Sequence, residues 1–84
     1  METKETNKPS QPQKIMSQRL KRVEAHNKTA QNLEEAAKNY FTAAKYLQAG
    51  NEEFASEHTL KAKGHILIAA ELQEEYIKLP VIAD

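Results

Sequence analysis

The sequence has no cysteine, only two glycines and no long apolar run. Without cysteine there is no disulfide and no cysteine nucleophile, and the chain is compatible with any redox compartment. Gly50 and Gly64 are solitary, so a glycine-rich phosphate loop is excluded. No apolar run approaches the roughly 18 residues of a membrane span. These absences exclude several classes of enzyme and membrane protein.

The chain also lacks an excess of charge of either sign. Twelve basic and twelve acidic side chains cancel, which argues against long-range attraction to nucleic acid or to an anionic membrane. The basic segment 14–28 has no interleaved aromatics, so it is interpreted as a solvated face rather than a nucleic-acid site. The first nine residues lack the apolar core of a signal peptide. We therefore expect a soluble cytoplasmic protein.

What the sequence does contain is helical periodicity on both sides of residues 49–51. Apolar and small residues recur at alternating steps of three and four, the pattern of a helix that packs lengthwise on a partner. In the first half these are Val23, His26, Ala30, Leu33, Ala37, Tyr40, Ala44 and Leu47. In the second half they are Ala55, His58, Ala62, His65, Ala69, Leu72, Tyr76 and Leu79.

The turn between the halves is predicted at Ala49-Gly50-Asn51. Gly50 can adopt the positive φ that ends a helix, and Asn51 is a good N-cap for the next one. A tight turn makes the helices antiparallel and sets alanines of one helix beside large residues of the other. The predicted pairs are Ala44 with His58, Tyr40 with Ala62, Ala37 with His65, Leu33 with Ala69, Ala30 with Leu72, His26 with Tyr76 and Val23 with Leu79.

The predicted fold is an all-α, antiparallel two-helix hairpin, with helices over about residues 11–49 and 51–79. Residues 1–10 are polar and broken by Pro9, so a mobile tail is expected there. Ser10 and Pro12 fit the start of the first helix, as a cap and a first-turn proline. Residues 80–84 are expected to form a short C-terminal tail after Pro80.

Several large apolar residues lie off the predicted seam. A lone helix pair of this size buries too little surface to be secure, so it needs a metal, a partner or a second copy. We expect these residues to form an interface in a homodimeric four-helix bundle made from two hairpins, or with another protein partner. They are Ile15, Met16, Leu20, Phe41, Leu60, Ile66, Leu67, Ile68 and Ile77.

The histidines are the candidate metal ligands. His58 and His65 are seven residues apart, about 10.5 Å along a helix, so one helix alone does not bring them to one ion. A two-fold partner brings each near its own copy, with Glu57 as a further ligand. A divalent transition metal at the seam or subunit interface is therefore the alternative function, beside histidines that are partly buried core residues.

The sequence contains no arrangement typical of an enzyme. Ser17 and Ser56 have no arranged base. The adjacent glutamate pairs point about 100° apart on a helix and do not converge. The tyrosines and Phe41, at helical spacing, are interpreted as core and seam residues rather than as a ligand site. We expect a non-enzymatic interaction or scaffold module without a cofactor.

Two resemblances arise around the turn. Ala43, Tyr46, Gly50, Ala55 and Ala62 stand at the spacings of a tetratricopeptide repeat, a helix-turn-helix unit that binds peptides. This similarity covers one repeat, residues 36 to about 69, and a single repeat does not form the usual groove.

Residues 25–79 resemble small bacterial alanine- and histidine-rich helical proteins of unknown function. The similar segments are 35–40, 48–52, 63–65 and 69–71. The resemblance implies a helical hairpin and, in the histidine-rich members, metal affinity. This chain carries Asn39, Tyr40 and Ile66 where those proteins tend to carry histidine.

Overall fold

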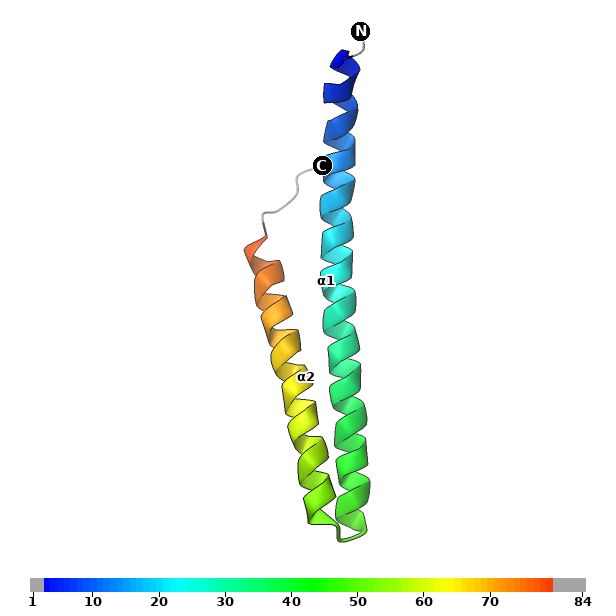
Figure 1. Ribbon diagram of the computed structural model, residues 1–84, viewed down its shortest axis with the longest axis vertical. Coiled ribbons are helices and arrows are strands. Elements are labelled where there is room, and N and C mark those ends of the chain that lie inside the picture. The colour runs from blue at the N-terminus through cyan, green and yellow to red at the C-terminus, as the bar shows by residue number, and fades with distance from the viewer. Residues whose placement is uncertain (1–2, 80–84) are drawn as a thin grey trace.

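Two antiparallel helices make up the protein. The computed structural model describes the backbone of residues 3–79 and the side chains of residues 15–79. Within this range, α1 (Thr3–Gln48) and α2 (Glu52–Lys78) lie side by side as a hairpin (Figure 1). The predicted all-α hairpin is therefore confirmed. The molecule is a rod with extents of 73 × 19 × 16 Å.

The turn is a Schellman motif closed by glycine. The Asn51 N–H donates to the Tyr46 carbonyl at 2.8 Å, and the Gly50 N–H donates to the Leu47 carbonyl at 3.0 Å, the two bonds of this motif. Gly50 has a φ of +79°, which is costly for any residue with a Cβ. The side chain of Asn51 then accepts from the Phe54 N–H at 3.2 Å and caps α2. The predicted turn is confirmed.

The helices differ in length, with 46 residues in α1 and 27 in α2. At 1.5 Å per residue α1 is about 30 Å longer. It begins at Thr3 rather than near residue 11, so residues 3–10, expected to be a mobile tail, are helical. The sequence prediction gave most weight to Pro9 and Pro12, whereas the lysines, the glutamate and the two glutamines around them are good helix formers. Residues 1–2 and the predicted tail 80–84 lie outside the described residues.

The seam between the helices is filled by alanine. Among residues 15–79 the buried side chains, each at most 4% exposed, are Ala36, Ala43, Ala55, Ala62 and Ala69. Side chains this small let two helix backbones approach closely. On α2 the predicted seam positions from Ala55 to Tyr76 are buried or half-buried, as expected, while Leu79 remains 38% exposed.

On α1 the face that contacts α2 is displaced by one residue from the predicted face. We call this contacting face the inner stripe; it comprises Arg22, Ala25, Thr29, Asn32, Ala36, Asn39, Ala43 and Tyr46, all buried or half-buried. We call the predicted seam the outer stripe; it comprises Val23, His26, Ala30, Leu33, Ala37, Tyr40, Ala44 and Leu47, all exposed. One residue turns a helix by about 100°, so the outer stripe lies to the side of the contact with α2, although the ring of its His26 still reaches Tyr76 of α2.

The predicted pairing is therefore wrong except at one end. His58 and His65 pair with Asn39 and Asn32 rather than with alanines. His26 lies beside Tyr76 as predicted, with ring centroids 4.1 Å apart. The outer stripe carries the stronger apolar pattern, but in the predicted pairing it sets both half-buried histidines beside alanines, whereas the inner stripe gives each an asparagine as hydrogen-bond partner.

Candidate functional site

Two histidine–asparagine bonds cross the seam. Nδ1 of His58 lies 2.9 Å from Oδ1 of Asn39, and Nδ1 of His65 lies 2.9 Å from Oδ1 of Asn32. An amide oxygen only accepts, so each imidazole donates through Nδ1. The two histidines are seven residues apart, and so are the two asparagines. The bonds therefore repeat once per heptad. If α2 slipped along α1 by one heptad, one histidine and one asparagine would each lose its hydrogen-bond partner. The two bonds therefore favour the observed register of the helices.

Aromatic rings flank these bonds at the turn end of the hairpin. The ring of Tyr46 stacks on His58 with centroids 5.6 Å apart and meets Phe54 edge-on at 5.3 Å. Tyr46 is half-buried, whereas Tyr40 and Phe41 are exposed on α1. Tyr46 and Tyr76 therefore lie at the seam of the hairpin as interpreted, whereas Tyr40 and Phe41 lie outside that seam because the contacting face is the inner stripe.

At the other end of the hairpin, Tyr76 lies between a histidine and an arginine. Its ring is tilted by 44° against that of His26, and the Arg22 guanidinium carbon lies 5.5 Å from its centroid. A cation over an aromatic face is attracted by the ring quadrupole. This contact holds the last turns of α2 against α1.

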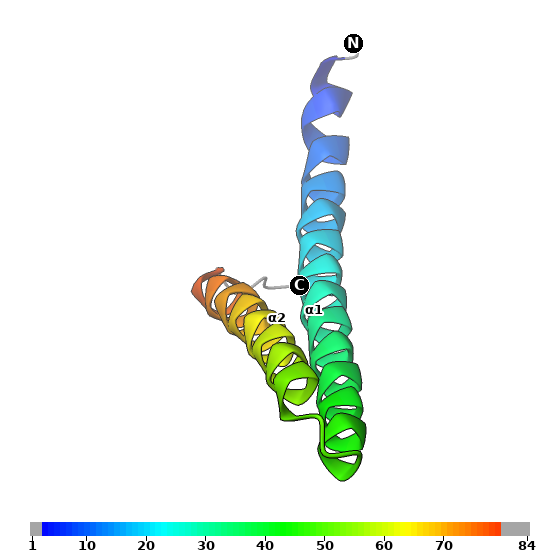
Figure 2. The ribbon, with the colours of Figure 1, turned by 60° about the horizontal axis from the view of Figure 1, so that its bottom comes forward.

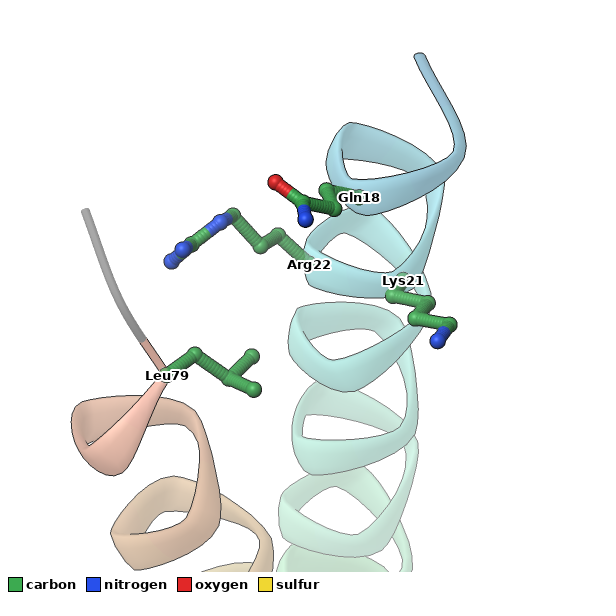
Figure 3. Close-up of a pocket in the computed structure, with 4 residues that line it drawn as sticks. All are labelled: Gln18, Lys21, Arg22 and Leu79. Carbon is green, nitrogen blue, oxygen red and sulfur yellow. The ribbon is translucent and has the colours of Figure 1, made fainter. Parts of the chain in front are cut away.

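Beyond Tyr76 a small open cleft of about 120 Å³ marks where α2 stops covering α1. It is lined by Gln18, Lys21, Arg22 and Leu79. In Figure 3, Gln18 and Arg22 extend from α1 on the side of α2, Leu79 points towards α1, and Lys21 points away. These four lining residues are exposed or half-buried, and they include two cationic side chains and one leucine. The cleft therefore does not enclose a ligand.

The predicted metal ligands do not converge within one chain. Glu57 is exposed and precedes His58 by one residue, so the two side chains leave α2 about 100° apart. Both histidines use Nδ1 towards asparagine. No group of three ligand-type side chains suited to a metal ion occurs within the described part of the chain. Metal binding between subunits stays a prediction, and a higher Tm with zinc, nickel or copper would support it.

The predicted interface residues lie on the outside of the hairpin. Met16, Leu20, Phe41, Leu60, Ile66, Leu67, Ile68 and Ile77 are each 37% exposed or more, and only Ile15 is half-buried. Leu20 and Phe41 reach 61% and 72%. An isolated hairpin thus leaves large apolar side chains on both helices in water, an arrangement that marks interaction surfaces.

The sequence prediction missed the outer stripe as a candidate interface because it assigned that stripe to the hairpin seam. Within the stripe, Val23, Leu33, Tyr40 and Leu47 are between 45% and 56% exposed. The signal that separates the two stripes is polar: asparagines recur at the heptad spacing on α1, as histidines do on α2. Matching these two repeats would have selected the inner stripe as the face for α2.

Comparison of the chain with protein-family models, with curated proteins and with solved structures finds no match. Neither helix offers, within residues 3–79, an apolar stretch of the length and hydropathy that crossing a membrane requires.

Proposed function

We propose that this chain is a non-enzymatic helical interaction module that self-associates, as a dimer in which two hairpins form a four-helix bundle. The observation that carries the proposal is the inversion of side-chain size across the hairpin. Alanines fill the seam, whereas leucines, isoleucines and phenylalanines lie outside it. Large exposed apolar surfaces on a small helical chain are typical of association surfaces.

The energetics of a hairpin this small support the same proposal. Burying alanine contributes far less than burying leucine, because the hydrophobic effect scales with the apolar area removed from water. A chain of this size usually needs a metal, a disulfide or a partner for stability, and cysteine is absent. A second copy buries the outer apolar residues with the symmetry that most soluble oligomers have.

Sedimentation equilibrium between about 1 and 100 μM, with and without zinc, tests the proposal. We expect a mass twice the 9.5 kDa of one chain without metal, together with a Tm that rises with protein concentration. A helical, cooperatively melting species of one chain mass at all concentrations contradicts self-association. A dimer that forms only when zinc is present contradicts it too and favours the metal alternative.

A further inference from the structure

We propose that a second copy of this chain packs its α1 antiparallel on the outer stripe, about a two-fold axis near residues 31–32 of both α1 helices. The inference rests on the proposed self-association and names the face, the direction and the register. Both views of the ribbon place α2 on one side of α1, which leaves another side open (Figures 1 and 2).

The outer stripe has the form of a second helix-packing seam. Its three-and-four spacing extends without a break from Met16 through Arg19 to Leu47, about 46 Å at 1.5 Å per residue. It lies about 100° around α1 from the inner stripe. Neighbours on a helix in a four-helix bundle are separated by about a right angle, so a second α1 fits there without displacing α2.

Side-chain sizes favour the antiparallel register that overlaps the whole seam. When Met16 of one copy lies beside Leu47 of the other, three of the five distinct layers join an alanine to a larger residue. The further layers are Arg19 with Ala44, Val23 with Tyr40, His26 with Ala37, and Ala30 with Leu33 of the second copy. Layers of alternating bulk interdigitate without voids or overpacking. A parallel copy would instead set alanine against alanine at positions 30, 37 and 44.

The residues that border the stripe also match in this register. Leu20 and Phe41, which are 61% and 72% exposed in the hairpin, come to lie opposite each other, one on each copy. Asn27 comes opposite Glu34, and further out Glu24 comes opposite Lys38. In a parallel copy the two-fold axis would place these border residues and their copies on opposite sides of the seam, so the contacts of Leu20 with Phe41 and of Glu24 with Lys38 would be lost.

Disulfide cross-linking tests the register, because the natural chain has no cysteine. Val23→Cys and Tyr40→Cys variants are mixed in equal amounts, allowed to exchange and then oxidised. We expect the mixture to form a cross-linked dimer of one chain of each variant. Neither variant alone should cross-link, because its own copies lie about 26 Å apart along the axis, far beyond the Cβ separation of about 4 Å that a disulfide needs.

Each other pattern of cross-links overturns the proposal in its own way. Efficient cross-linking of each variant alone indicates parallel helices. Cross-linking of Val23→Cys with Leu47→Cys in place of Tyr40→Cys indicates a register shifted by one heptad. A dimer by sedimentation that gives none of these cross-links places the interface elsewhere, for example on α2, and leaves only the proposed self-association standing. If the natural chain is a monomer, both the proposed self-association and the proposed register are wrong.

A second measurement uses substitutions that leave the hairpin itself intact. Phe41→Gln changes an exposed residue of the hairpin, so the helicity of the monomer at low concentration should be unchanged. We expect the dimer dissociation constant to rise at least about tenfold, because two-fold symmetry places the change twice in the interface. Leu60→Gln is the matched control, because Leu60 on α2 is 66% exposed, close to the 72% of Phe41. An equal or larger effect of the control overturns the proposal.

Discussion

The inner and outer stripes of α1 are one residue apart in the chain and differ in chemistry. The inner stripe, which contacts α2, consists mainly of alanine, asparagine and threonine. The outer stripe carries valine, leucines and a tyrosine, and it is exposed. The less apolar of the two stripes makes the intramolecular seam. Size and hydrogen-bonding complementarity, rather than hydrophobicity alone, therefore select the face on which α2 packs.

The largest loss of stability is expected from a substitution that places a larger side chain in the close-packed seam. On α2, Ala69 is 3% exposed and faces the inner stripe, whereas the adjacent Ala70 is exposed, so the two form a matched pair inside and outside the seam. Ala69→Leu should lower the free energy of unfolding by about 1–3 kcal/mol because the added atoms overpack the seam. Ala70→Leu should change it by less than about 0.5 kcal/mol. Urea denaturation at one fixed protein concentration measures both. Equal effects would mean that the seam is not close-packed at α2.

For Ala37→Leu, the sequence predicts overpacking, because it places Ala37 in the seam opposite His65. Ala37 is exposed, and His65 bonds to Asn32 instead. The overpacking expected for Ala37→Leu therefore belongs to Ala36→Leu, since Ala36 is 3% exposed.

The turn that aligns the stripes offers the next largest contrast, between the only two glycines of the chain. Gly50→Ala should destabilise the hairpin by about 1–2 kcal/mol because its φ of +79° is strained for a residue with a Cβ. Gly64→Ala should stabilise it by about 0.5–1 kcal/mol, since Gly64 lies inside α2 with no atom within 4 Å of an added Cβ. Thermal melts of both variants measure these shifts. Shifts of the same sign would contradict the observed turn.

Local signals were sufficient to predict most of the fold. Gly50 and Asn51 located the turn because positive φ and helix capping depend on single residues. The α2 seam was predictable because its alanines and histidines keep one three-and-four pattern from Ala55 to Tyr76, whereas the larger apolar residues of α2 do not keep that spacing over the whole helix. The residue at which α1 begins was not predictable. The good helix formers of its first turns favour a helix, whereas its two prolines disfavour one.

The α1 seam was not predictable from apolar periodicity alone, because α1 carries two overlapping stripes. A pattern of this kind shows that a face is buried in some assembly, and it does not show which partner buries it. The choice depends on contacts between residues far apart in the chain, here Asn32 with His65 and Asn39 with His58. The predicted interface residues were grouped because they lie outside any single seam, and their role as an interface stays a prediction.

The smallest change in stability is expected when one of these histidine–asparagine bonds is removed. Asn32→Ala removes the acceptor for His65, and the bond should be worth near the lower end of about 0.5–1.5 kcal/mol because both residues are only half-buried. Alanine also favours helix over asparagine, so Asn27→Ala, at an exposed position of the same helix, supplies the propensity gain to be subtracted. Both variants are measured at a protein concentration low enough to keep the chain monomeric, because Asn27 borders the proposed interface. A double-mutant cycle with His65→Ala then isolates the coupling. Zero coupling energy would mean that shape alone aligns the inner stripe with α2, whereas a coupling of the expected size would make the histidine–asparagine bonds the reason that the more apolar stripe is left for a partner.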